Sequence, residues 1–320
     1  MCQTPWTDEL LPAVAAANAH SSSKLVEIGK QLSKVDDPRF SIIVVGSYAR
    51  MEANSRSDFD YFLYSPKKST RKAESLHKNI AEIICGCGIS PPSAGGPFGD
   101  GYCCLSDFTT KIGGDHETNK SLTRRLLLLL ESKWLTGERH YDQLLAKVLT
   151  RYIGRLTAET SVARFFLNDL IKYYRTVCVD FEYKTVEVGK DWGIRNIKLA
   201  FSRKLIYFSG LLVAAETAQR EALEKRRIVK SLLALPPIER IQSIAGDRSL
   251  PALKCYDRFL EAMADDDFRK MLSRVTDKKK TQAPEFRELK NEAQHFTWAL
   301  SQCVRDCYAP SHPIHLAIEY

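Results

Sequence analysis

Short apolar runs separated by polar breaks mark the first 145 residues of the chain. The run Ser41–Val45 (SIIVV) is rich in β-branched residues and predicts a strand. A second run, Phe59–Tyr64, predicts another strand, which Pro66 ends. Tyr102–Ile112 resembles a third strand, closed by a pair of glycines. These segments predict a small sheet.

Helical periodicity surrounds these strands. Apolar residues spaced by three and four predict one or two helices between Thr7 and Ser33 and an amphipathic helix at Arg71–Cys87. A short helix is expected at Tyr48–Asn54, between the first two strands. Beyond residue 122 the pattern is almost entirely helical, with predicted helices at Leu122–Leu135, Thr160–Phe181 and Asp191–Thr217. We therefore expect an α+β protein with an N-terminal helical segment (1–35), a small sheet-containing core (36–145) and an all-helical domain (146–320).

Charge and apolar content narrow the class of protein. The formal net charge is +8, which favours anionic partners such as nucleotide phosphates or RNA without establishing one. The longest apolar tracts, Leu126–Leu130 and Leu205–Ala215, are far shorter than the roughly 20 residues of a membrane span. No basic stretch precedes an apolar segment at the N-terminus, so no signal peptide is expected. We expect no membrane partner.

The nine cysteines are odd in number and contain no CxxC pair. Most of them stand among apolar residues, as small buried side chains do in a reducing cytosol, which predicts a cytoplasmic protein. Cys303 and Cys307 lie one helical turn apart, with His312 and His315 just beyond. A metal site there is the alternative.

Two aspartates interrupt the second predicted strand. Alternate side chains of a strand share a face, so Asp58 and Asp60 should point the same way. Two unpaired carboxylates that lie so close repel each other, and burying them is costly. A divalent cation removes this penalty, since Mg²⁺ binds one or two carboxylates together with substrate phosphates. Two such ions can stabilise both the attacking oxygen and the leaving oxygen when a phosphoryl group is transferred.

The residues just upstream suit a phosphate. Gly46 follows the first predicted strand and allows close approach of a ligand to the backbone. Ser47 stands where that strand turns into a helix, and free backbone N–H groups at such a turn favour an anion. The sequence thus predicts a phosphate contact at Gly46-Ser47 and a metal site at the two aspartates.

The string GSYARMEANSRSDFDYFLY resembles the signature of the DNA polymerase β superfamily of nucleotidyltransferases. It is similar to the branch that includes PII-protein uridylyltransferases and related nucleotidyltransferases, in which a Gly-Ser pair precedes Ala-Arg, Glu, Ser-Asp and a second Asp. Five positions of this chain match that run beyond Gly-Ser: Arg50, Glu52, Ser57, Asp58 and Asp60. The resemblance implies a mixed-sheet nucleotidyltransferase core with a helical domain packed beside it.

The resemblance also implies a third carboxylate on a later strand, which binds metal and can act as a base. Asp107 is the only acid within the predicted strand Tyr102–Ile112, and we assign it this role. Asp100, Asp115 and Glu117 in the flanking loops are rivals. If none of them serves, the protein could be a binding-only relative.

Several cations are candidates for phosphate contacts. Arg50 could reach an NTP phosphate or pair with Glu52 on the same short helix. In the resembled family a helical domain commonly completes the nucleotide pocket, which makes Arg195 and Lys198 candidates; a solvated helix face is the alternative reading. Ser57 is included among the nucleotide-binding residues because it matches the signature. Arg124-Arg125, at the start of a predicted helix, is a further alternative.

Together these features predict a metal-dependent nucleotidyltransferase. An NTP is the expected substrate, and Mg²⁺ or Mn²⁺, held by Asp58, Asp60 and Asp107, is the expected cofactor. A nucleoside monophosphate would pass to a hydroxyl of a protein, an RNA or a small molecule, with release of pyrophosphate. Two alternatives stay open: a nucleotide second-messenger synthase and a non-catalytic nucleotide-binding module.

Overall fold

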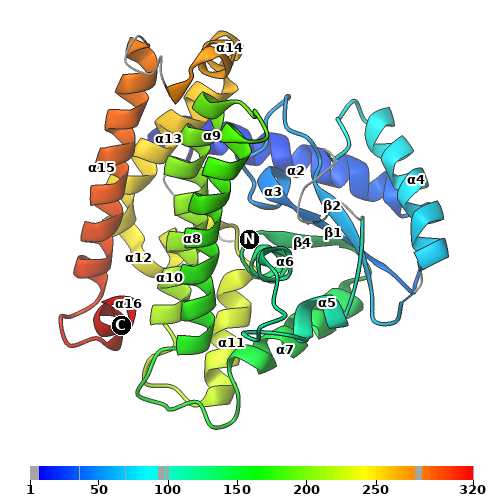
Figure 1. Cartoon of the computed structure of the whole chain (residues 1–320), viewed down its shortest axis with the longest axis horizontal. Helices are drawn as coiled ribbons and strands as arrows, with labels where there is room; N and C mark the ends of the chain where they lie inside the picture. The colour runs from blue at the N-terminus through cyan, green and yellow to red at the C-terminus, as the bar shows by residue number, and fades with distance from the viewer. Residues whose placement is uncertain are drawn as a thin grey trace.

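The computed structural model describes residues 7–35, 37–68, 70–92, 98, 101–277 and 283–319. A small sheet lies beside a bundle of long helices (Figure 1). This arrangement confirms the predicted α+β class, with a mixed-sheet core followed by helices. None of the described helices is both long enough and apolar enough to cross a bilayer.

The sheet has four strands in the order β3-β2-β1-β4. Their bounds are β1 Ser41–Val45, β2 Tyr61–Ser65, β3 Tyr102–Cys104 and β4 Ser132–Thr136. Strand β1 pairs antiparallel with both β2 and β4, whereas β2 and β3 are parallel. The predicted strand Ser41–Val45 is confirmed, and the second strand begins at Tyr61, directly after Asp60.

Two predicted elements are wrong in part. The segment Tyr102–Ile112 is a strand only to Cys104 and then forms the short helix α5 (Ser106–Thr109). The chain turns there because the Asp107 carboxylate accepts a hydrogen bond from the Cys104 N–H (2.7 Å). The predicted helix Leu122–Leu135 is instead helix α6 (Asn119–Leu130) followed by β4. The apolar pattern continues through both elements, but pairing with β1 makes the chain extended from Ser132 onward.

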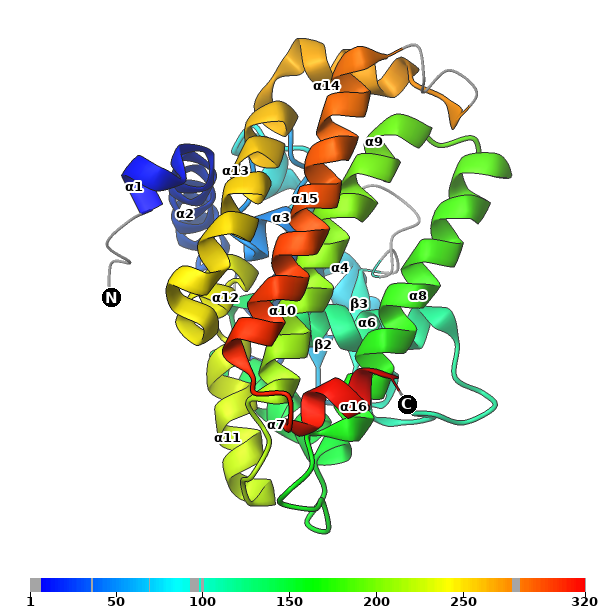
Figure 2. The same ribbon diagram turned by 90° about the vertical axis from the view of Figure 1, so that its left-hand side faces the viewer.

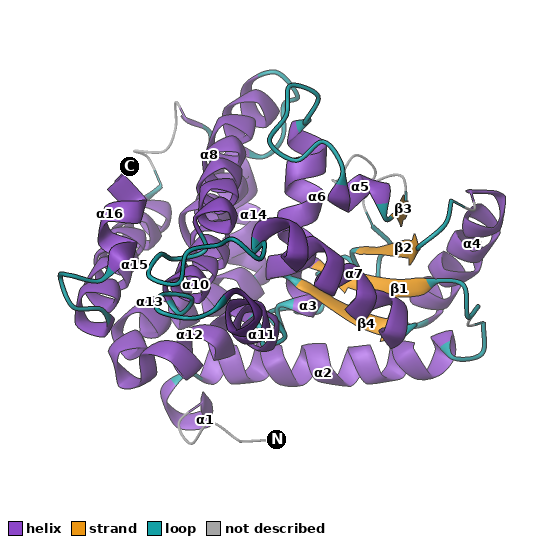
Figure 3. Ribbon diagram, turned by 90° about the horizontal axis from the view of Figure 1, so that it is seen from below, coloured by secondary structure: helices purple, strands orange, loops and turns teal. Residues whose placement is uncertain are grey.

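Helices cover both faces of the sheet (Figure 3). Helices α2 (Pro12–Leu32) and α4 (Thr70–Gly86) pack on one face, against the side chains of Ile42, Val44 and Leu63. Helices α5, α6 and α7 (Glu138–Tyr152) pack on the other. Two short helices complete this part, α1 (Thr7–Leu10) before α2 and α3 (Gly46–Ala49) directly after β1.

The remainder of the described chain is helical, and its long helices run side by side in Figure 2. The elements are α8 Arg164–Val186, α9 Trp192–Lys198, the π-helix η1 Leu199–Arg203, α10 Lys204–Ala215, α11 Ala222–Leu233, α12 Pro237–Ala245, the 3₁₀-helix η2 Gly246–Ser249, α13 Leu250–Ala264, α14 Asp266–Arg274, α15 Pro284–Cys307 and α16 Pro313–Glu319. The helix predicted at Asp191–Thr217 is therefore interrupted by a π-helical segment.

One apolar core joins the sheet to this bundle. Ile43, Val45, Phe62 and Tyr64 belong to the same buried cluster as side chains of α6, α8, α10 and α13. Helices α5, α6 and α7 cover this face of β1 and β2, and α6, which also packs on α8 and α10, makes its apolar side chains continuous with the bundle.

Candidate active site

Asp58 and Asp60 lie on one side of the segment that leads into β2, the side that carries Phe62 and Tyr64 within the strand. Phe59, between them, is fully buried in the other cluster with Tyr61 and Leu63. Alternation along an extended chain therefore turns both aspartates the opposite way, where they stay partly exposed. No hydrogen bond or ion pair to either carboxylate occurs within the described part of the chain.

Gly46 lies against Asp60. The Val45 N–H donates to the Asp60 carbonyl (2.9 Å), which extends the pairing of β1 and β2 by one residue. Gly46 has a φ of +74°, and a Cβ there would stand 2.9 Å from Oδ2 of Asp60. Only glycine adopts this backbone freely while leaving room for the carboxylate. Ser47 follows directly and is half-buried, so the predicted Gly-Ser turn and the acidic pair share one end of the sheet.

The loop before Asp58 is closed by Ser57. Its hydroxyl accepts a hydrogen bond from the Asn54 N–H (3.1 Å), and its own N–H donates to the Asn54 carbonyl (3.0 Å). The predicted nucleotide-binding residue Ser57 thus shapes the turn that leads to Asp58. Met51, at the start of this loop, has a φ of 62°.

Arg50 is buried and paired with acids. Its Nε donates to Oε2 of Glu52 (2.8 Å), and Nη1 donates to Oε2 of Glu131. The side chains of both acids are only 2% exposed. Of the two roles predicted for Arg50, the structure shows the pairing with Glu52.

Glu131 is the residue that sequence reasoning missed. The register pairs Val45 with Ser132, which places Glu131 beside Gly46, on the β4 side of β1. Asp60 flanks the same turn from the β2 side. Asp58 and Asp60 are marked by their pairing and by the Gly-Ser signature, whereas a single acid after a leucine run also fits the predicted helix Leu122–Leu135.

The bundle presents three cations to this acidic end: Lys198, Arg203 and Arg269. We call these three residues the basic face. Lys198 ends α9 and Arg203 ends the π-helix η1, and π-helical segments are frequent at functional sites because they redirect side chains. Arg203 Nη1 lies 3.7 Å from Oε1 of Glu131. Asp58 interacts electrostatically with Lys198 and Arg269, and Asp60 with Arg203.

These charges shift two protonation equilibria. Burial raises the pKa of Asp60 to about 6, and the negative charges of Asp58 and Glu131 act in the same direction. Although Lys198 is exposed as a whole, protein atoms packed around its ammonium group lower its pKa to about 8, and the charges of Arg269 and Arg203 lower it further. The carboxylates of Asp58 and Asp60 thus repel each other on one side of the site, and the cations repel one another on the other side. Such an arrangement favours a ligand that carries both a cation and an anion.

Lys198 and Arg269 lack an acidic partner at ion-pair distance among the described residues. They come from helices that touch each other, since a Cβ on Gly193 of α9 would stand 2.3 Å from the Leu272 carbonyl of α14. The Gly193 N–H also donates to the carbonyl of Val275 (3.2 Å). Close packing of α9 on α14 therefore holds two uncompensated cations together.

The structure does not bring Asp107 together with the two aspartates. The register Ser65↔Cys104 puts Asp107 beyond the C-terminal end of β2, whereas Asp60 precedes its N-terminal end. Among the rivals, Asp115 is exposed, and Asp100 lies outside the described residues. None of the described contacts joins the predicted contact Arg195 to Asp58 or Asp60.

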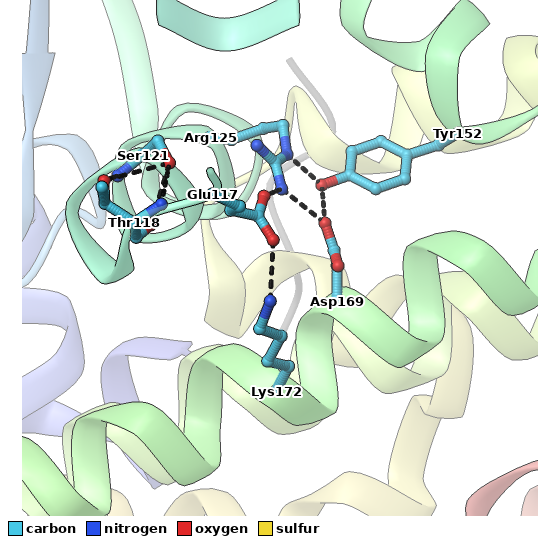
Figure 4. A network of polar contacts seen from close by, with 7 residues as sticks. All are labelled: Glu117, Thr118, Ser121, Arg125, Tyr152, Asp169 and Lys172. Atoms are coloured by element: carbon cyan, nitrogen blue, oxygen red, sulfur yellow. Dashed lines mark hydrogen bonds and ion pairs between the residues drawn. The ribbon is translucent and has the colours of Figure 1, made fainter. Parts of the chain in front are cut away.

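Glu117, the remaining rival, belongs to a separate buried network (Figure 4). Arg125 donates to Glu117, to Asp169 (2.6 Å) and to the hydroxyl of Tyr152. Lys172 reaches the second oxygen of Glu117 from the surface (2.7 Å). Arg125 has no exposed side-chain area, so the alternative role of Arg124-Arg125 in phosphate binding does not fit Arg125.

A divalent cation fits the carboxylate pair. Across the described ranges, no three His, Cys, Asp or Glu side chains gather closely enough to hold a metal by themselves. The alternative metal site at Cys303, Cys307 and the nearby histidines is therefore not formed among these residues. Asp58 and Asp60 nevertheless offer two unpartnered carboxylates that crowd each other. Mg²⁺ commonly takes one or two protein carboxylates and completes its shell with phosphate oxygens and water.

The sequence of this region decides the type of domain. Residues 22–85 match the model of the nucleotidyltransferase domain, and the match covers the C-terminal half of α2, β1, the Gly-Ser turn, both aspartates, β2 and nearly all of α4. The chain carries a nucleotidyltransferase domain. The resemblance to the DNA polymerase β superfamily is confirmed at this level, and the uridylyltransferase-like branch stays a prediction. No curated protein gives a significant match to the chain.

Proposed function

We propose that this nucleotidyltransferase domain transfers a nucleoside monophosphate from an NTP to an acceptor hydroxyl, with Mg²⁺ or Mn²⁺ as cofactor and release of pyrophosphate. One observation carries the proposal. Asp58 and Asp60 stand at the Gly46 turn without partners in the described contacts, and they face cations from the bundle. In a metal-bound triphosphate, the metal ion would neutralise the two carboxylates and the phosphate groups would neutralise the cations.

Asp58 and Asp60 would hold the metal. When bound, the metal would neutralise phosphate charge and lower the barrier for attack by the acceptor oxygen. Gly46 leaves the backbone open to the phosphates, and Ser47 adds a hydroxyl beside them. Glu131 and Arg50 would not touch the substrate; their ion pair fixes the β4 side of the same turn.

Lys198 and Arg269 would bind the triphosphate. Both are cations without an acidic partner in the described part of the chain, and a lysine or arginine positioned on phosphate oxygens stabilises the charge that passes to the leaving group. In the reaction the acceptor hydroxyl loses its proton to solvent and its oxygen bonds to the α-phosphorus, while the bond from that phosphorus to the oxygen that bridges it to the β-phosphorus breaks. Pyrophosphate leaves with the electron pair.

The test is a screen of the four NTPs with Mg²⁺ or Mn²⁺, in which released pyrophosphate is measured with and without cell lysate as a source of acceptor. Mass spectrometry of the products separates transfer to an acceptor from synthesis of a free nucleotide messenger, which the same site would serve. We expect metal-dependent pyrophosphate release with at least one NTP. Nucleotide binding without any release under all conditions would contradict the proposal and favour a non-catalytic binding module.

A further inference from the structure

Arg56 and Asp266, which are 210 positions apart in sequence, form a two-pronged ion pair. Nε and Nη2 of Arg56 donate to the two carboxylate oxygens of Asp266. Beside this pair, Nδ2 of Asn54 donates to the carbonyl of Met263 (3.2 Å). The two contacts tie the loop before Asp58 to the corner between α13 and α14.

Both ends of this pair lie next to the site. Arg56 precedes Asp58 by two residues, and Asp266 precedes Arg269 by one helical turn on α14. The backbone of Asp266 is itself fixed, because Oδ1 of Asp265 caps the helix by accepting from the N–H groups of Asp267 (2.8 Å) and Phe268 (2.9 Å). Any change in the pair therefore moves a rigid helix end relative to the aspartate loop.

Four charges meet at this corner. Arg269 interacts electrostatically with Arg56, with Asp266 and with Asp58. Asp266 is the acid between two guanidinium groups that would otherwise repel each other. Bidentate geometry lets an arginine fix the orientation of a carboxylate as well as its distance. The pair is half-exposed, with 51% and 47% of the two side chains accessible, so its effect on overall stability is small.

We propose that Arg56 and Asp266 are a positioning pair that holds Arg269 of the basic face at the correct distance from Asp58. This inference rests on the proposed function, because Arg269 is taken to bind the phosphates of the substrate. Neither Arg56 nor Asp266 touches the substrate. Loss of the pair would let the end of α14 move away from the aspartate loop, and Arg269 would no longer reach the same phosphate oxygen.

The test compares Asp266→Asn with a matched control, Asp267→Asn. Asp267 is the next residue of α14, its side chain is 91% exposed, and it pairs only with Lys270 among the described side chains. The control substitution therefore removes the same charge but leaves the contact between Asp266 and Arg56 in place. The probe is inorganic tripolyphosphate, titrated by calorimetry. NTP turnover supplies KM and kcat.

The direction in which tripolyphosphate affinity changes distinguishes loss of the positioning contact from simple loss of a negative charge. Simple removal of a negative charge should tighten the binding of an anion, and we expect this small effect for Asp267→Asn. Asp266→Asn should instead weaken tripolyphosphate binding about tenfold and lower kcat/KM by ~10–100-fold, mainly through KM. Asp266→Glu, which keeps the charge, should recover most of the loss.

The two proposals fail separately. Tighter or unchanged binding in Asp266→Asn would overturn the positioning pair even if the wild-type protein turns over NTP. Absence of turnover in a wild-type protein that binds tripolyphosphate, with weaker binding in Asp266→Asn, would contradict the proposed function and support the pair. A wild-type protein that binds no tripolyphosphate and releases no pyrophosphate from any NTP would overturn both.

Discussion

The carboxylate of Asp60 occupies the space that a side chain on Gly46 would need, with 2.9 Å from Oδ2 to the position of such a Cβ. Gly46→Ala should therefore cost about 1–2 kcal/mol of stability, because its φ is +74° and alanine is strained there. The loss of turnover should be larger, about 100-fold, because Asp60 must move aside. Thermal unfolding and pyrophosphate release measure the two effects.

Gly29→Ala is the matched control for this prediction. Gly29 lies within α2, and a Cβ there would meet no atom within 4 Å. Alanine should raise stability by up to about 1 kcal/mol through helix propensity and leave turnover unchanged. Equal turnover in the two variants would show that the contact between Gly46 and Asp60 has no part in the reaction.

The pH dependence of kcat/KM should be bell-shaped. Asp60, whose pKa is raised to about 6, must be ionised to hold a cation, so kcat/KM should rise as the pH passes through about 6. Lys198, whose pKa is lowered to about 8, must be protonated to bind phosphate, so kcat/KM should fall above about 8. In Lys198→Arg the side chain stays charged. The alkaline limb should then disappear, and its persistence near pH 8 would assign that limb to another group.

Removal of a cation of the basic face should act mainly on binding. Lys198→Met and Arg269→Met should each raise KM for the NTP by about 10-fold or more, with a smaller effect on kcat, because each removes a charge–phosphate contact. Steady-state kinetics at fixed metal concentration give both constants. A matched change at Lys270, on the same helix and paired with Asp267, should leave KM unchanged. An equal rise in the Lys270 variant would indicate a general charge effect.

The network around Arg125 should contribute to stability and not to chemistry. Arg125→Met would leave Glu117 and Asp169 buried without their shared cation, which costs about 3–5 kcal/mol. Lys172→Met removes only the surface contact to Glu117 and should cost less than about 1 kcal/mol. Denaturant unfolding measures both. Similar stability of the two variants would contradict this account of the network.

The sequence predicted those parts of the site that lie within one short segment. Four of the five residues of Ser41–Val45 are β-branched, and the alternation of Asp58, Phe59 and Asp60 predicts that Phe59 is the buried side chain. Glu131 was not found, because a leucine run followed by Ser-Lys-Trp is compatible with a continuing helix. Only the pairing of β4 with the free edge of β1 determines that the chain extends there.

The basic face was predicted only in part. Lys198 and Arg195 are both candidates because a helical domain completes the nucleotide pocket in the resembled family, but of the two only Lys198 interacts electrostatically with Asp58 among the described contacts. The π-helical segment redirects Arg203 toward Glu131, and this irregularity leaves no mark in the apolar spacing. Arg269 comes from a helix more than 60 residues further on and reaches the site only through the packing of α14 on α9.

The most direct test of the account is pyrophosphate release by Asp60→Asn, compared with the wild-type protein and with Asp107→Asn, at equal metal and NTP concentrations. The replacement keeps the size of the side chain and removes the charge that would bind the metal. We predict that Asp60→Asn releases no pyrophosphate above background and that Asp107→Asn, whose carboxylate caps Cys104 at the far end of β2, stays active. Full activity of a folded Asp60→Asn protein would contradict the central claim.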